Sequence, residues 1–160
     1  MINDAVFAQI LTNKDVPFYA SNVCNPDHIC TWNDVERYIN NNSHNSEIVT
    51  INLDGNKTIY KSSETSRVNT KELYDNLLLG DSFILNYMER YNKSLFTISN
   101  TVSKIFNNYV TTNIYGGLQS YSKSFKTHAD SQYVLILHLS GESEWIIFKE
   151  DWNGNPNEVV

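Results

Sequence analysis

The pattern of apolar and polar residues changes its period several times along the chain, and each change predicts a different element. Helical spacing of the apolar residues predicts helices over four ranges: 3–12, 32–39, 70–79 and 95–109. Alternating or β-branched stretches predict five short strands, the last running into a Gly116-Gly117 turn: 16–20, 47–53, 57–61, 81–87 and 110–115. Helices and strands are thus expected to mix over about the first 110 residues.

Local end signals support several of these elements. Asp54-Gly55 is a hairpin turn signal between the strands at 47–53 and 57–61. Thr31, with Asp34 three residues later, is typical of a helix N-cap, and Asn69 or Thr70 is expected to cap the next helix. These signals fix where the elements begin more firmly than the apolar pattern alone.

Two apolar runs near the C-terminal end predict further strands. Residues 133–139 are apolar at both parities, as in a buried barrel strand, Gly141 is expected to turn the chain, and 144–148 is the strand that follows. Closely spaced strands are typical of a sandwich or jelly roll. The expected fold is therefore α+β: a single domain over 1–160, with a mixed helix and strand region at 1–109 and the first half of a β core at 110–160.

Composition and charge limit the classes of function that the chain could have. The chain has 160 residues, enough for one domain with a real core. Its net charge is −6 and no basic stripe interleaves with aromatic residues, so we expect no nucleic-acid binding. The N-terminus does not resemble a signal peptide and no apolar run is long enough to cross a bilayer, so a cytoplasmic protein without membrane contact is expected. Cys24 and Cys30, with His28 between them, are too few for a structural zinc site and are interpreted as reduced thiols.

His128-x-Asp130, just before the first apolar run, is the motif that carries chemistry. Residues i and i+2 of an extended segment point to the same side, so an imidazole and a carboxylate can bind one ion together. They would form two thirds of the 2-His-1-carboxylate site of non-haem Fe(II) oxygenases. The alternative is a solvated histidine and an aspartate that caps a loop.

The surrounding residues resemble a known family. Asn113-x-Tyr115, Phe125, His128-x-Asp130, the apolar run ending at Gly141, and Trp145 are similar in order to the first half of the JmjC-type cupin (cupin-4) domain, and most closely to its ribosomal-oxygenase group. The order of the upstream elements also fits, so the likeness extends over most of the chain, but only the stretch from 113 to 148 is specific.

The resemblance implies a double-stranded β-helix, or jelly-roll, that holds Fe(II) and uses O₂ and 2-oxoglutarate to hydroxylate a protein or peptide side chain. His128 and Asp130 match the first two iron ligands. Asn113 and Tyr115 match residues in or near the co-substrate pocket, and the alternative for them is a strand amide and a core tyrosine.

The chain departs from the family pattern at the iron site. The family's second iron-binding histidine lies several tens of residues after the first pair, and no histidine follows His138 in this chain. His138 itself is ten residues from His128, about 33 Å along a strand, so it is interpreted as a histidine of the barrel interior. The chain therefore resembles the front half of a barrel. We expect an N-terminal fragment, a decayed domain, or a sheet completed by another chain, as in a homodimer.

A second departure concerns the co-substrate. The family places a lysine or arginine two residues after the glycine, where it pairs with the distal carboxylate of 2-oxoglutarate. This chain has Ser143 there, between Glu142 and Glu144, so Lys123, Lys126 or a base elsewhere would have to replace it. Three functions stay open at this point: an Fe(II)/2-oxoglutarate oxygenase, a non-catalytic cupin-like binding module with a vestigial metal pair, and a cupin enzyme that uses another metal without 2-oxoglutarate.

Overall fold

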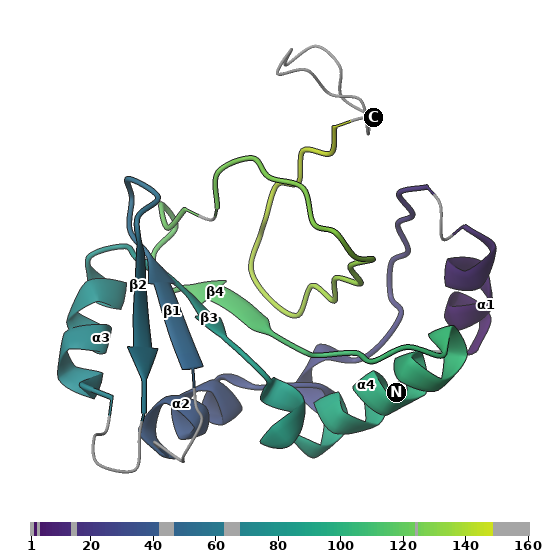
Figure 1. Ribbon diagram of the computed structural model, residues 1–160, viewed down its shortest axis with the longest axis horizontal. Coiled ribbons are helices and arrows are strands. Elements are labelled where there is room, and N and C mark those ends of the chain that lie inside the picture. The colour runs from purple at the N-terminus through teal and green to yellow at the C-terminus, as the bar shows by residue number, and fades with distance from the viewer. Residues whose placement is uncertain are drawn as a thin grey trace.

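A computed structural model describes residues 2, 4–13, 16–41, 47–62, 68–123 and 125–148. They form a mixed α+β fold around an open, four-stranded antiparallel sheet with the strand order β2-β1-β3-β4 (Figure 1). The elements in chain order are α1 (Asp4–Thr12), η1 (Pro26–His28), α2 (Trp32–Asn41), β1 (Glu47–Ile51), β2 (Lys57–Lys61), α3 (Thr70–Leu78), β3 (Ser82–Leu85), η2 (Met88–Arg90), α4 (Lys93–Phe106) and β4 (Ile114–Gly117). The four predicted helices are confirmed, with ends shifted by a few residues.

The β1–β2 hairpin is confirmed, and its turn chemistry explains it. Asn52 Oδ1 accepts hydrogen bonds from the backbone N–H groups of Asp54 (3.0 Å) and Asn56 (2.9 Å). Gly55 has φ +81°, in the left-handed region that glycine adopts without strain. The turn therefore sets the register in which Ile51 faces Lys57.

One face of the sheet, the inner face, packs against the helices. Its residues Ile48, Phe83 and Leu85 are buried, and they belong to one core with apolar residues of the helices. The helical contributors are Phe7 of α1, Val35, Tyr38 and Ile39 of α2, Leu73 and Leu77 of α3, and Leu95, Ile98 and Val102 of α4. This core is where most of the apolar burial that stabilises the fold is concentrated.

The caps that the sequence predicted are present. Thr31 and Asp34 form a reciprocal capping box: the Thr31 N–H and hydroxyl donate to Asp34 Oδ2 at 2.9 Å and 2.8 Å, and the Asp34 N–H donates to Thr31 Oγ1 at 3.4 Å. Asn69 caps α3, where its side-chain oxygen accepts from the Glu72 N–H at 3.3 Å. Such caps satisfy N–H groups that a helix start leaves without partners.

The opposite face, which we call the outer face, is far less covered. Val49, Ile51 and Ile84 are buried there, whereas Ile59 and Tyr115 of the flanking strands are 55% and 59% exposed. Directly opposite residues of an antiparallel ladder point to the same side, which places all five on this face. Any segment that docks on the outer face therefore meets an apolar surface.

The two free edges of the sheet differ in chemistry. β2 begins with Lys57 and ends with Lys61, whereas β4 has the sequence Ile-Tyr-Gly-Gly without a charge. Gly116 and Gly117 were predicted to form a turn, and that prediction is wrong, because they pair with Phe83 and Ser82 inside β4. A Cβ at Gly116 would lie 2.5 Å from Phe83 Cζ, so glycine is needed where this ring fills the space.

The strand predicted at 16–20 is also wrong. Residues 17–20 have no regular secondary structure, and Val16 and Tyr19 are 60% and 86% exposed. Pro17 lacks the N–H that a ladder requires, and exposed apolar side chains provide no burial that would hold a strand in place.

Residues 133–139 and 144–147, predicted to be strands, have no regular secondary structure, and Phe148 lies in an isolated β-bridge. No backbone hydrogen bond is present between Val134–Ile147 and the rest of the described chain. Tyr133–Ile136 and Trp145–Ile147 are between 41% and 73% exposed, while Leu137 and Leu139 pack partly against the main core. A strand needs a hydrogen-bonding partner, and because both parities of this run are apolar, the pattern does not specify a register. The part of the predicted fold that the structure supports is thus the α+β region with its open sheet.

Two further points concern chain organisation. The predicted division at 109/110 runs through the sheet, because β3, before it, pairs with β4, after it. Within the described part of the chain, no helix has the length and apolar character needed to cross a membrane.

Candidate functional site

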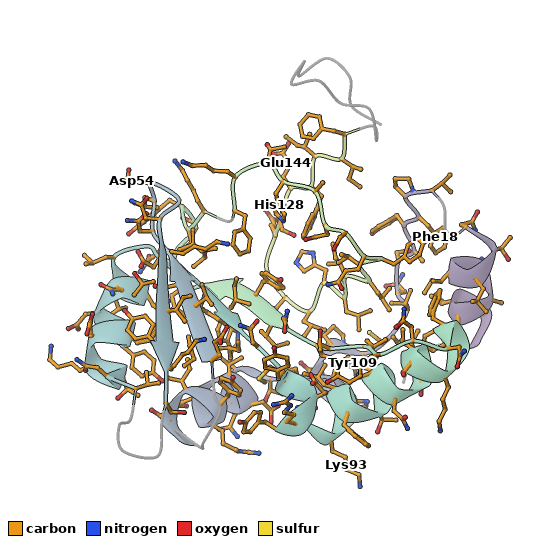
Figure 2. All side chains as sticks on the ribbon, in the orientation of Figure 1. Phe18, Asp54, Lys93, Tyr109, His128 and Glu144 are labelled. Atoms are coloured by element: carbon orange, nitrogen blue, oxygen red, sulfur yellow. The ribbon has the colours of Figure 1, made fainter. Side chains whose placement is uncertain are left out.

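The segment 125–130 carries the His128-x-Asp130 motif, and Phe125 anchors it to the outer face. The Phe125 ring packs against Val49, Ile51 and Ile84. Across the ring, Lys57 Nζ lies 4.5 Å from the ring centroid, a cation–π contact. Figure 2 shows His128 in the middle of the view and the hairpin end, marked by Asp54, well to its left. Through Phe125, the motif is therefore attached to the β1–β2 hairpin, which precedes it by more than sixty positions.

His128 and Asp130 lie next to each other, as the i, i+2 spacing predicted. His128 Nε2 is 3.9 Å from Asp130 Oδ2, and both side chains are about half exposed. His128 Nδ1 lies 2.8 Å from the backbone carbonyl oxygen of Lys126. A carbonyl can only accept, so Nδ1 carries the proton in this bond and the lone pair of a neutral imidazole is on Nε2, toward Asp130.

This arrangement fits two ligands of a metal ion. A backbone carbonyl that fixes the histidine tautomer is the usual outer partner of a metal-bound imidazole. Two ligands at neighbouring octahedral positions, each about 2.1 Å from the ion, are about 3 Å apart, so Nε2 and Oδ2 would have to close by roughly 1 Å. Both side chains are exposed enough to rotate by that amount.

The described residues do not bring a third ligand to this pair. Among them, no group of three His, Cys, Asp or Glu side chains is placed to hold an ion. His138 is exposed, with Nε2 3.0 Å from the Ser140 carbonyl oxygen, so the described residues do not enclose it, and its place in a barrel interior stays a prediction. His28 is exposed in η1, and His44 lies outside the described residues.

The two residues proposed near the co-substrate have different surroundings. Tyr115, in β4, points to the outer face, and its ring centroid is 6.3 Å from that of Phe125 in an edge contact. Phe125 in turn contacts His128 edge-on, with centroids 5.4 Å apart. Asn113 instead accepts a hydrogen bond from the Tyr87 N–H at 3.3 Å. Tyr87 has a left-handed backbone with φ +59°, so Asn113 stabilises the turn into η2.

Lys57 is a residue of this site that the motif did not identify. It belongs to β2, opposite Ile51, and therefore lies on the outer face next to Phe125. The Asp54-Gly55 turn signal fixes this register, so the sequence contained the information that a lysine occupies this face. Lys126, named from sequence only as a substitute base, lies against Gly55: its Cε is 3.0 Å from the position that a Cβ there would take.

For two other features of the described residues, the structure gives no contact with His128 or Asp130. Cys24 and Cys30 are free thiols packed against the main core, and burial, with a smaller effect of the Asp34 charge, raises the pKa of Cys30 to about 11. A groove of about 600 Å³ runs along α4, lined by residues that include Arg90, Lys93 and Phe96. None of the candidate site residues lines this groove.

Comparisons of the chain with protein-family models, with curated proteins and with solved structures find no match. The likeness to JmjC-type cupins therefore depends on the residues of the chain itself.

Proposed function

We propose that this chain is part of an Fe(II)- and 2-oxoglutarate-dependent oxygenase of the JmjC-type cupin kind, which hydroxylates a side chain of a protein or peptide. The observation that carries the proposal is the His128–Asp130 pair, 3.9 Å apart, with the histidine lone pair directed by the Lys126 carbonyl. A neutral nitrogen and a charged oxygen on one short segment are the donor types that non-haem Fe(II) sites use.

In this proposal, different residues of the chain have different roles. His128 and Asp130 would hold the metal, which when bound supplies the oxygen chemistry. The Phe125 ring covers one side of His128, and Tyr115 contacts Phe125 in turn. The third protein ligand has to come from outside the described residues or from another chain.

The proposal includes a jelly-roll core. In it, 133–139 and 144–148 become strands when partner strands cover them. The exposure of Tyr133–Ile136 and Trp145–Ile147 supports this, because apolar side chains at both parities are typical of a strand buried on both faces. A second copy of the chain would be one source of such strands, and we place the protein in the cytoplasm, where Cys24 and Cys30 stay reduced.

The test is succinate formation from 2-oxoglutarate with Fe(II) and O₂, in the protein and in three variants. His128→Ala and Asp130→Ala are expected to abolish it, whereas His28→Ala, an exposed histidine in η1, is expected to leave it unchanged. Turnover that persists undiminished in Asp130→Ala would refute the iron-ligand role. An anaerobic Mn(II) titration of the same variants measures the ligands separately from the reaction.

A second candidate is a non-catalytic binding module that keeps the metal pair only as a vestige. The observation that favours it is that no third ligand joins the pair among the described residues. It predicts no succinate with any metal and equal Mn(II) affinity for the protein and its His128→Ala variant.

A further inference from the structure

The groove along α4 lies between the helix and the segment that follows it. After α4, the chain runs back alongside the helix to β4 (Figure 1). Two hydroxyl groups of the helix tie this segment down: Ser99 Oγ donates to the Val110 carbonyl oxygen at 2.8 Å, and Ser103 Oγ donates to the carbonyl oxygen of Asn108. The groove has a volume of about 600 Å³, which is within the range of ligand-binding sites. Its two walls are therefore fixed to each other before a partner binds.

The length of the groove fits a short extended peptide. Its α4 wall includes Lys93, Phe96, Asn100 and Ser103, whose spacing places them along one face of the helix. Ten helical residues from the first to the last of these rise about 15 Å. An extended chain advances about 3.3 Å per residue, so this wall is as long as about four or five peptide residues.

One end of the groove is positively charged. It is lined by Arg90 and Lys93, which are both exposed. The guanidinium group of Arg90 lies 4.4 Å from the centroid of the Tyr87 ring, and no ion pair reaches Lys93 within the described ranges. Glu89 also lines the groove, but its side chain is only 10% exposed. One of its oxygens accepts from the Thr112 N–H at 2.9 Å and the other is 4.0 Å from Arg90 Nε.

This end belongs to the basic part of an acidic chain. Residues 90–129 contain five of the twelve lysine and arginine residues and none of the eighteen aspartate and glutamate residues. The rest of the chain has seven basic and eighteen acidic residues, which accounts for its negative net charge. Such an asymmetry directs a negatively charged partner to the part of the molecule that contains α4.

The remainder of the groove is neutral and partly aromatic. Phe96 and Tyr109 are 57% and 74% exposed, and Asn100 is an exposed amide. Exposed aromatic rings beside a cation are typical of surfaces that bind an apolar side chain of another protein. A nucleic acid has a phosphate at every nucleotide, whereas the cations of this groove lie at one end, so the distribution of charge favours a peptide.

We infer that the α4 groove binds an acidic peptide segment of a partner protein. One or two carboxylates of the segment pair with Arg90 and Lys93, and an aromatic or aliphatic side chain two or three residues further on packs against Phe96 and Tyr109. This surface is independent of the proposed function, because none of the candidate site residues lines the groove. In Figure 2, Lys93 points away from His128.

The experiment measures fluorescence anisotropy of a labelled, amidated peptide, Glu-Glu-Ser-Phe-Leu, at low salt. Lys93→Glu is expected to weaken binding about five- to tenfold, because an attraction becomes a repulsion. Phe96→Ala is expected to weaken it about fivefold. Lys104→Glu is the matched control, since Lys104 is exposed on the same helix but does not line the groove, and its affinity should stay within about twofold of that of the unchanged protein.

Both variants should remain folded, because a glutamate suits the first turn of a helix and the Phe96 side chain is exposed; thermal melts check this. Four results would overturn the inference: no binding of the peptide, equal affinity for Gln-Gln-Ser-Phe-Leu, an equal loss in Lys104→Glu, or tighter binding of a labelled oligothymidylate. The third would show a general charge effect, and the fourth a nucleic-acid surface.

Discussion

Replacing Phe125 with alanine is expected to release the 125–130 segment from the sheet while the sheet itself stays folded. The ring packs against Val49, Ile51 and Ile84 and is partly buried, which is worth about 2 kcal/mol of apolar transfer. The Lys57 contact adds about 0.5–1 kcal/mol. The expected loss in the free energy of unfolding is therefore about 2–3 kcal/mol, less than for a fully buried phenylalanine, because the space left behind opens to water.

Urea unfolding measures this loss, and Phe96→Ala is the control, since Phe96 is 57% exposed on α4 and should cost less than about 0.5 kcal/mol. A second readout is the NMR shift of the His128 ring protons, because the Phe125 ring lies 5.4 Å away and contributes a ring current. If Phe125→Ala costs no more than Phe96→Ala, or the His128 shifts stay the same, the anchoring role of Phe125 is refuted.

Three further changes test the fold. Tyr38→Phe should lower the free energy of unfolding by about 1–3 kcal/mol, because the Asn86 carbonyl and the Glu47 N–H, both partly buried, lose their hydrogen bonds to the hydroxyl. Burial raises the pKa of Tyr38 from 10.0 to about 12, so its contribution is complete below pH 10 and is lost as pH rises toward 12; urea unfolding against pH should show this loss in the protein and not in the variant. Asp34→Ala should lower the free energy of unfolding by about 0.5–1 kcal/mol at neutral pH. The Thr31 N–H lowers the pKa of Asp34 below 3.8, so thermal melts should show the difference shrinking as pH falls through that lowered pKa, and a constant difference would contradict the cap. Ile136→Lys should change stability by less than about 0.5 kcal/mol, as little as Tyr19→Lys, because both side chains are exposed; a larger loss in thermal melts would reveal a buried strand.

Elements with local signals could be predicted from the sequence. The hairpin was predictable because Asp54-Gly55 determines a turn without help from the rest of the chain, and α2 because Thr31 and Asp34 satisfy its first N–H groups. The conformation of the 133–139 run could not be predicted in this way. A strand exists only with a partner strand, and the apolar pattern contains no information about which segment supplies that partner.

The candidate site, too, could be predicted from the sequence only in part. The proximity of His128 and Asp130 follows from their i, i+2 spacing alone. The place of Lys57 depends on a contact with Phe125, 68 positions later in the chain, which no local rule provides. The hairpin register did place Lys57 on the outer face, but only the structure shows which segment covers that face.

The two sheet edges differ in how readily a further strand could pair with them. A strand that approaches β2 meets lysines at both ends of that strand, and such charges discourage pairing. A strand that approaches β4 meets an uncharged edge with two glycines, where backbones can come close. A charge at the exposed Tyr115 should therefore weaken the pairing of any further strand with β4, while a charge at the exposed Ile59 of β2 should have little effect.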